Sequence, residues 1–276
     1  MNNFMGVFIM EKIFNKNVFW GILVVLVFTV SMTALNSGNT VETSAGTLSN
    51  ELIGWGIKRS DNHEQPDVGK KNKKLLDEAE GICLGNAEKK VIYLTFDNGY
   101  EAGYTSKILE TLKNNNVTAT FFITAHYLNT QPELVKQMID EGHIVGNHTV
   151  NHKSMPSLTE DQIKKEVMDL HESIKSKFNY EMKYIRPPKG EYSERTLSIC
   201  NSLGYKTVMW SFAYADWDEK KQPDETKAKE MIFNNLHNGE IMLLHATSKT
   251  NANILDSVLK EIKAQGYEIK AISEFE

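Results

Sequence analysis

Short apolar runs alternate along the chain with longer segments in which apolar residues recur every three or four positions. The short runs are rich in β-branched and aromatic residues, which is typical of buried strands. They lie at 90–96, 119–124, 143–146, 184–185, 206–210, 240–244 and 267–271. The longer segments predict helices at 105–115, 132–141, 159–178, 193–203 and 253–265. This alternation predicts an α/β fold, with βα units around a parallel sheet or barrel.

The N-terminal part of the chain has a different pattern. Residues 18–35 (VFWGILVVLVFTVSMTAL) carry no charge, and Lys12 and Lys16 precede them. At about 1.5 Å per residue, this run is just long enough to span a bilayer, and the lysines fit the positive-inside rule. We therefore predict a cleaved signal peptide or a retained membrane anchor over residues 1–35, and favour the anchor. In both cases the rest of the chain lies outside the cytoplasm.

The rest of the chain divides into three parts by composition. Residues 36–50 are small and polar and predict a linker. Residues 51–89 contain KKNKKLLDEAE, a solvated amphipathic helix, and predict an N-terminal extension packed on the main domain. Residues 90–276 carry the regular alternation of strands and helices and form that main domain.

Composition narrows the class of protein. The chain of 276 residues has a formal net charge of −5, so it has no basic excess with which to neutralise a phosphate backbone. Nucleic-acid binding is therefore not expected. The two cysteines, Cys83 and Cys200, are too few for a disulfide scaffold or a thiolate zinc site. We predict that both are buried, unpaired thiols.

Unusual polar residues follow the predicted strands. Asp97 follows the first strand, the pair His148 and His152 follows the third, Arg186 follows the fourth, and His245 follows the run at 240–244. The carboxyl ends of parallel strands share one edge of a sheet or barrel, and that edge carries the active site in α/β proteins. We therefore expect these side chains to meet.

The histidines in GNHTVNH are four positions apart. On a helical turn this spacing places both imidazoles on one face, where they suit zinc, cobalt or nickel. The same spacing also occurs in ordinary surface histidines, so alone it does not establish a metal site. His143 lies in the preceding strand segment, and we interpret it as structural.

Three other segments carry candidate chemistry. Asp97 in TFDNGYE is a metal ligand or a general base, although Asp-Asn-Gly also favours a plain turn. In RPPKGEY, two prolines stiffen the backbone, Arg186 can hold a carboxylate, and the N–H of Lys189 is free for a ligand. His245, oriented by an aspartate such as Asp216, is a general-acid arrangement, although a lone histidine is more often structural.

Taken together and in this order, TFDNGYE, HTVNH, RPPKGEY, ADW and LLH resemble the five motifs of the polysaccharide deacetylases that share the NodB homology domain, carbohydrate esterase family 4. The resemblance covers residues 90–275. The segment GWGIKRSDNHEQPDVGK at 54–70, together with Asn98, is similar to one subgroup, the delta-lactam-biosynthetic de-N-acetylases of the bacterial spore cortex.

The resemblance implies a distorted (β/α) barrel and a metal-assisted hydrolysis of a sugar N-acetyl group. It implies that Asp97 is the base and that His148 and His152 bind a divalent metal such as zinc, cobalt or manganese. Most of the wider family has a second aspartate as a third metal ligand where this chain has Asn98. An amide oxygen binds a divalent cation more weakly than a carboxylate, so we expect weaker metal retention.

The resemblance also assigns the remaining polar residues. It implies that Arg186 holds the base, that the Lys189 backbone N–H helps to form the oxyanion hole, that His245 is the general acid, and that Asp216 tunes this acid. The residues that it implies for substrate binding are Lys189, Asn98, Trp217 and Leu243.

The subgroup implies the substrate, N-acetylmuramic acid without a stem peptide in peptidoglycan glycan strands. Loss of its acetyl group exposes a 2-amine beside the 3-lactyl carboxyl, and the two can close a six-membered lactam. A cation near that carboxylate would help, and the Lys189 side chain is the candidate. A muramoyl-alanine amidase that removes peptides first is the implied pathway partner, and the spore envelope, during sporulation or germination, is the implied location.

Three alternatives remain. The same chemistry on another glycan would make a peptidoglycan N-acetylglucosamine or chitin deacetylase. A glycan-binding protein without catalysis is supported only by the missing carboxylate at Asn98. A metalloprotease is disfavoured, because HTVNH lacks the glutamate that directly follows the first histidine of H-E-x-x-H.

Overall fold

The computed structural model describes residues 48–275. The apolar run at 18–35 and most of the predicted linker lie outside the described residues. Within the described part, none of the helices combines the length and the apolar composition needed to cross a membrane.

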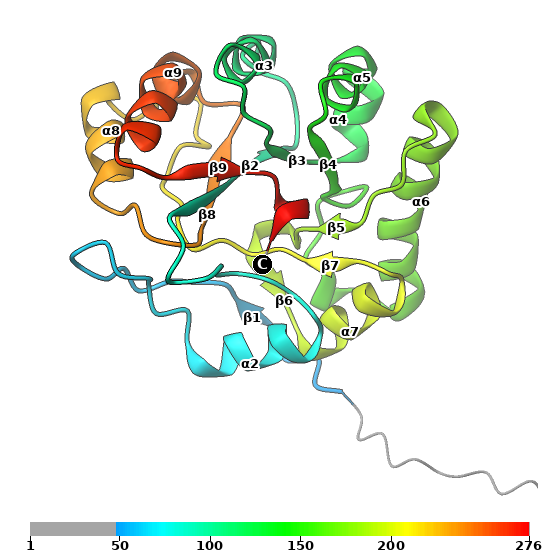
Figure 1. Cartoon of the computed structure of the whole chain (residues 1–276). Coiled ribbons are helices and arrows are strands. Elements are labelled where there is room, and N and C mark those ends of the chain that lie inside the picture. The colour runs from blue at the N-terminus through cyan, green and yellow to red at the C-terminus, as the bar shows by residue number, and fades with distance from the viewer. Residues whose placement is uncertain (1–47, 276) are drawn as a thin grey trace, which may run out of the picture. The chain divides into compact units, whose positions relative to one another are not determined.

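A curled sheet of parallel strands forms the centre of the molecule (Figure 1). Its order is β7-β5-β4-β3-β2-β8, and β9 pairs with β2. The bounds are β2 Val91–Asn98, β3 Thr120–Ile123, β4 Ile144–Asn147, β5 Tyr184–Ile185, β7 Lys206–Thr207, β8 Glu240–His245 and β9 Glu268–Lys270. The pairs are parallel throughout. This curled sheet of parallel strands confirms the predicted distorted (β/α) barrel.

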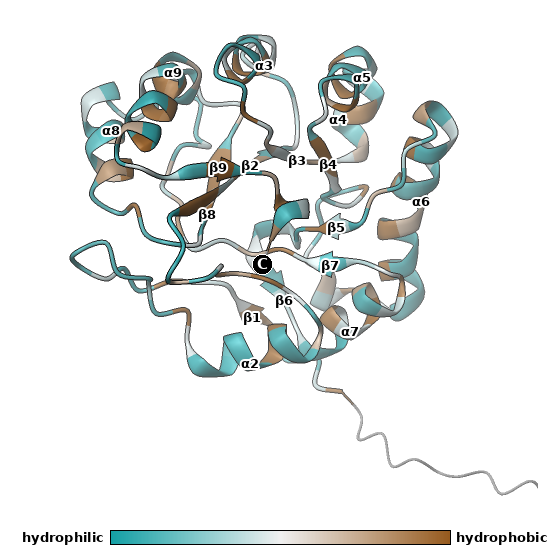
Figure 2. Cartoon of the chain, in the orientation of Figure 1, coloured by the Kyte–Doolittle hydropathy of each residue, from teal (hydrophilic) through white to brown (hydrophobic). Residues whose placement is uncertain are grey.

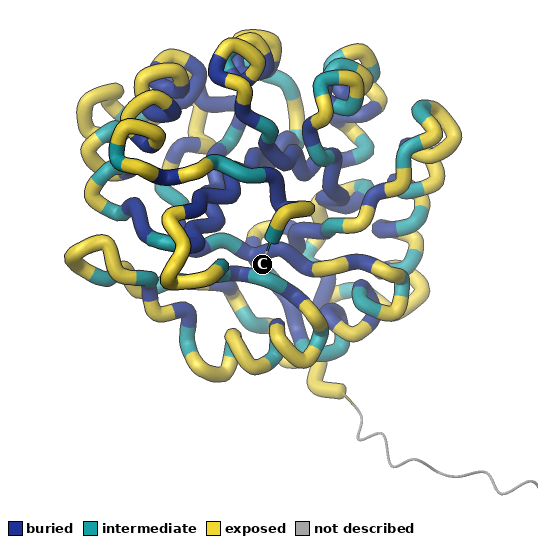
Figure 3. The backbone as a smooth tube through the Cα atoms, viewed as in Figure 1, coloured by how far each residue is buried: buried dark blue, intermediate teal, exposed yellow. Residues whose placement is uncertain are grey.

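Helices surround the sheet with their apolar sides turned towards it, except α2, which lies near β1 and α7 (Figures 1 and 2). Their bounds are α2 Lys70–Glu78, α3 Thr105–Asn114, α4 Ala125–Thr130, α5 Pro132–Asp140, α6 Glu160–Phe178, α7 Glu194–Ser202, α8 Glu225–Phe233 and α9 Lys249–Ala264. The strands and the inner faces of the helices are buried, and their apolar side chains form one large hydrophobic core (Figure 3). All residues of β2 are buried, which matches its continuous apolar run.

Local signals explain several helix ends. Thr159 caps α6 in a capping box with Gln162, as SLTEDQ predicts. Pro132 occupies the first turn of α5. Ser248 caps α9, which therefore begins at Lys249, four residues before the predicted start.

The sequence pattern missed some elements. The helix α4 is only six residues long, too short to show a clear period, and α8 was not predicted. The predicted strand at 206–210 shrinks to β7, because Val208 then makes only an isolated bridge to Ile82.

Residues 51–89 contact the main domain through short stretches of backbone pairing. In this segment β1 (Ile53–Gly54) pairs antiparallel with β6 (Glu191–Tyr192). The Trp55 N–H donates to Gly190 O at 2.8 Å, and its indole Nε1 donates to Trp210 O at 2.9 Å. The segment thus packs against the RPPKG turn.

Candidate active site

The carboxyl ends of the parallel strands open into a pocket of about 1000 Å³. Near the end of β2, Asp97 lies beside His245, because the two residues are Cα partners in the β2–β8 pair. Both line the pocket. Of the other predicted residues, those that line it are His148, His152, Lys189, Trp217 and Leu243.

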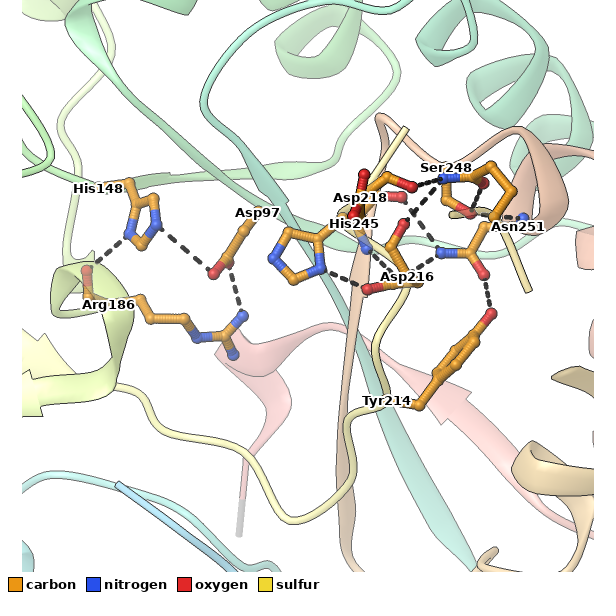
Figure 4. Close-up of polar contacts among 10 residues, drawn as sticks. Asp97, His148, Arg186, Tyr214, Asp216, Asp218, His245, Ser248 and Asn251 are labelled. Carbon is orange, nitrogen blue, oxygen red and sulfur yellow. Dashed lines mark hydrogen bonds and ion pairs between the residues drawn. The ribbon is translucent and has the colours of Figure 1, made fainter. Parts of the chain in front are cut away.

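Asp97 is held by two groups on one side (Figure 4). Arg186 Nη1 donates to Asp97 Oδ1 at 2.8 Å, and His148 Nε2 lies 3.5 Å from Asp97 Oδ2. Burial alone would raise the pKa of the Asp97 carboxyl, but the charges of Arg186 and the histidines hold this pKa below its usual value. The carboxyl is therefore ionised and able to accept a proton.

Arg186 is fully buried directly after β5. Its Nε donates to Val208 O at 3.1 Å, and its guanidinium lies 4.3 Å from the centre of the Phe122 ring. These contacts fix the cation that faces Asp97. They agree with the sequence expectation that Arg186 holds a carboxylate.

The two histidines meet, although the helical turn expected for them is wrong. Residues 148–152 form an irregular loop after β4. His148 Nε2 and His152 Nε2 are 3.1 Å apart, and His148 Nδ1 contacts Arg186 O at 2.8 Å. Because a carbonyl can only accept, Nδ1 of His148 carries the hydrogen and Nε2 presents its lone pair.

Both imidazoles are held neutral. Burial lowers the pKa of His148. Burial and the neighbouring His148 together lower the pKa of His152 to about 4. A neutral imidazole is the form that binds a metal.

The backbone conformation of the loop at 148–152, and not a helical turn, brings the two histidine rings together. Thr149 (φ 67°) and His152 (φ 54°) both adopt left-handed backbone. The Thr149 N–H donates to Asn147 Oδ1 at 2.8 Å, and the His152 N–H donates to Thr149 Oγ1 at 3.1 Å. The loop turns back on itself, and this brings the second ring to the first.

Asn98 is fully buried and is not among the residues that line the pocket. Its Nδ2 lies 3.4 Å from Thr105 Oγ1, at the start of α3. Its Oδ1 is buried and has no hydrogen-bond partner among the described residues. The amide oxygen is thus a polar atom that still lacks a donor or a cation.

His245 and Asp216 form a second polar pair on the other side of Asp97 (Figure 4). Asp216 Oδ1 lies 2.7 Å from His245 Nδ1, and Asp216 Oδ2 accepts the His245 backbone N–H at 2.8 Å. Burial disfavours the charged imidazole, but the hydrogen bond and charge of Asp216 outweigh this and raise the pKa of His245. The ring therefore keeps its proton to higher pH than a free imidazole does.

Sequence reasoning missed the residues that hold Asp216. Asn251 Nδ2 donates to Asp216 Oδ2 at 2.6 Å, and Tyr214 Oη contacts Asn251 Oδ1. Asn251 lies in the first turn of α9, before the predicted start of this helix at residue 253. The cap at Ser248 is the signal that could have placed it in the helix.

The RPPKG turn forms another wall. Lys189 (φ 60°) and Gly190 (φ 66°) both have left-handed backbone. A Cβ on Gly190 would lie 2.7 Å from the Trp210 ring, so this position requires glycine. Beside the pocket, Trp217 is 56% exposed, and its ring centre lies 6.0 Å from that of His245.

The remaining sequence expectations concern structural residues. His143 is buried and its Nδ1 accepts the Ala119 N–H at 3.2 Å, so its structural role is confirmed. Cys83 and Cys200 are buried and unpaired, as predicted.

The two histidines fit one divalent cation. Two imidazoles bound to the same tetrahedral zinc at about 2.0–2.1 Å would have their nitrogens roughly 3.3–3.4 Å apart, close to the observed separation. No set of three or more His, Cys, Asp or Glu side chains in residues 48–275 is arranged to hold a metal. A metal held by these histidines would therefore need an amide, water or substrate oxygen as well.

Known proteins match both the sequence and this arrangement. A family model described as polysaccharide deacetylase matches residues 84–208. The peptidoglycan-N-acetylmuramic acid deacetylase PdaA of Bacillus subtilis is 44% identical over 231 residues, which are 83% of this chain and 88% of PdaA. A peptidoglycan-N-acetylglucosamine deacetylase of Bacillus cereus is 31% identical over 186 residues, 66% of each protein.

Solved structures agree with these matches. The structure of Bacillus subtilis PdaA, a family 4 carbohydrate esterase, superimposes with a TM-score of 0.80 and covers 83% of this chain and 98% of PdaA. A family 4 carbohydrate esterase from Bacillus anthracis is 40% identical with a TM-score of 0.71, and the match covers 83% of this chain and 98% of that one.

Proposed function

The chain belongs to the polysaccharide deacetylases, hydrolases of carbohydrate esterase family 4, and we propose that it removes the acetyl group from N-acetylmuramic acid in peptidoglycan. The observation that carries the proposal is the pairing of Asp97 with His245 across β2 and β8 in one pocket. Their neighbours shift their pKa values in opposite directions, which makes one a base and the other an acid at the same pH.

Asp97 acts as the general base. Arg186 keeps its carboxylate ionised, so Asp97 can take the proton of a water molecule as that water attacks the acetamide carbonyl. The backbone N–H of Lys189, held in the left-handed turn, donates to the oxygen that becomes negative during the attack. Gly190 permits the close packing that fixes this turn.

His245 acts as the general acid. The sugar nitrogen is a poor leaving group unless it is protonated, and His245 supplies that proton from its Nε2. Asp216 holds Nδ1, so the acidic proton lies on the nitrogen that faces away from Asp216. Trp217 and Leu243 line the pocket beside this ring and form its apolar wall.

His148 and His152 would hold the divalent metal on which the family generally depends. Asn98, whose buried Oδ1 has no partner in the described part of the chain, is the third ligand in this proposal. When bound, a metal such as zinc, cobalt or manganese lowers the pKa of water and polarises the carbonyl.

The favoured substrate is muramic acid from which the stem peptide has been removed. This rests on the higher identity to the muramic acid deacetylase (44%) than to the glucosamine deacetylase (31%). Deacetylation would expose the amine that closes the muramic delta-lactam of the spore cortex. An amidase would act before it, and the N-terminal segment would secrete the enzyme or anchor it outside the cytoplasm.

Mass spectrometry of reaction products tests this function. The purified chain with added zinc is offered peptidoglycan strands stripped of peptides at some muramic acids, and acetylated chito-oligomers. Loss of acetyl and water at muramic acid is the expected result. Asp97→Asn is the inactive reference, and Asp140→Asn on the exposed side of α5 is the matched control.

The other outcomes identify the alternatives. Loss of acetyl from glucosamine alone would move the activity to a peptidoglycan N-acetylglucosamine or chitin deacetylase. No loss from either substrate would leave a non-catalytic glycan-binding protein.

A further inference from the structure

Glu166 is a buried carboxylate that the proposed mechanism does not use. It lies on α6, outside the pocket lining, and is 6% exposed. Both of its oxygens bind one residue: Oε2 accepts the Asn151 backbone N–H and Oε1 accepts Asn151 Nδ2, each at 2.7 Å. The Lys153 Nζ lies 3.8 Å away and is largely exposed, so it neutralises the carboxylate only weakly.

Asn151 is the residue directly before His152 in the loop that carries both histidines. The loop has no helical hydrogen bonds to set the spacing of the rings, and it contains two residues with left-handed backbone. Such a conformation costs free energy and persists only where surrounding contacts impose it. The position of His152 therefore depends on what holds the loop from outside.

The helix α6 supplies that support. The Val150 N–H donates to Glu166 O at 3.0 Å, and Asn147 Nδ2 donates to Val167 O at 2.9 Å. Together with the Glu166 carboxylate, these bonds tie the loop to α6 on both sides of His148. Among them, only the carboxylate reaches the residue next to His152.

We propose that Glu166 is a positioning residue for the metal site, an inference that rests on the proposed function of His148 and His152. The carboxylate fixes Asn151 through two charge-assisted hydrogen bonds, and Asn151 in turn fixes the backbone of His152 so that its Nε2 faces that of His148. Loss of the carboxylate removes both acceptors of Asn151 and frees the loop. Loss of an outer-sphere residue that supports a metal ligand typically lowers metal affinity by about 10–100-fold.

The experiment is a calorimetric titration of the full chain with zinc. Glu166→Met is similar in volume and cannot accept a hydrogen bond, so zinc affinity should fall about 10–100-fold. Glu166→Gln can still accept the Asn151 N–H, so it should restore most of the affinity. Glu172→Met, at an exposed position on the same helix, is the matched control and should bind as the parent does.

A second variant keeps the proposal testable if Glu166→Met does not fold. Asn151→Ala changes an exposed side chain, removes one of the two bonds and should weaken zinc binding severalfold. Parent-like affinity in Asn151→Ala and Glu166→Met overturns the proposal. Equal losses in Glu166→Gln and Glu166→Met also overturn it, because the effect would then follow charge alone.

The outcome for the parent protein separates this inference from the proposed function. A parent that binds zinc and deacetylates, with Glu166 variants that bind equally well, leaves the function intact and removes the role of Glu166. A parent that binds no zinc overturns the metal site and the role of Glu166 together.

Discussion

Asp97 and His245 are direct partners in the parallel pair of β2 and β8. Side chains at partner positions of neighbouring strands point to the same face of a sheet, so Asp97 and His245 enter one pocket from adjacent strands. Arg186 contacts Asp97, and Asp216 contacts His245. The register of a single strand pair therefore sets the relative position of the two groups that we propose transfer protons.

Substitution at either member of this pair should remove most of the activity. Asp97→Asn or His245→Ala should lower the deacetylation rate about 10²–10⁴-fold, the usual contribution of a positioned base or acid. Initial rates on peptide-free peptidoglycan measure the effect. The exposed Asp140→Asn should match the parent, and near-normal activity in either pocket variant would refute the role assigned to it.

The pH dependence of kcat/KM should report the pair His245–Asp216. Asp216 raises the pKa of His245, so the acid stays protonated to higher pH and activity is lost only as pH rises through this pKa. Asp216→Asn should therefore move the alkaline limb of the profile to lower pH. Asp218→Asn, two positions away and exposed, is the control. An unmoved alkaline limb in Asp216→Asn would show that another group donates the proton.

A carboxylate at position 98 should bind metal more tightly. Asn98→Asp converts a neutral oxygen ligand into a charged one, and it should increase zinc affinity in a calorimetric titration. Asn114→Asp, on the exposed end of α3, adds the same charge elsewhere and should leave the affinity unchanged. If Asn98→Asp binds zinc as the parent does, Asn98 is not a ligand.

Lys189→Met should separate deacetylation from ring closure. The backbone N–H of residue 189 is retained, so deacetylation should continue, whereas the cation beside the lactyl carboxylate is lost. The ratio of muramic lactam to open muramic acid, measured by mass spectrometry, should fall. An unchanged ratio would show that the Lys189 side chain does not promote cyclisation.

The thiols should be unreactive in the folded protein. Burial raises the pKa of Cys83 and of Cys200 to about 12, so neither forms a thiolate at neutral pH. Titration with a thiol reagent should detect almost none in the native protein and both after unfolding in denaturant without reductant. Absence of both thiols after unfolding would reveal a disulfide.

The meeting of the strand-end side chains followed directly from the sequence. Most of the predicted strands are apolar runs, and the first polar residues after them, such as Asp97 and Arg186, meet at the shared edge. Parallel topology makes this inference general, because all carboxyl ends meet on one side. The position of these strand-end residues was therefore predictable even where strand lengths were not.

The geometry between these residues was not predictable from spacing. The pair His148 and His152 was expected on a helix, but the loop obtains its shape from Glu166, more than a dozen residues later. Asn251 reaches Asp216 from α9 in the same way. Such hydrogen bonds depend on tertiary packing, which leaves no periodic trace in the sequence. The missed helix α8 does have a local signal, because Asp224 caps it directly after Pro223.

The central strand β2 pairs with β8 and β9 as well as with β3. Residues 240–245 and 268–270 are synthesised long after β2, so a nascent chain that ends before them has Asp97 without His245 and β2 without two of its neighbours. Strand pairings between residues this distant along the chain form slowly, because the entropy lost in closing a long loop opposes them. A chain truncated before β8 would therefore keep the loop of His148 and His152 but lack His245, the group that we propose protonates the leaving amine.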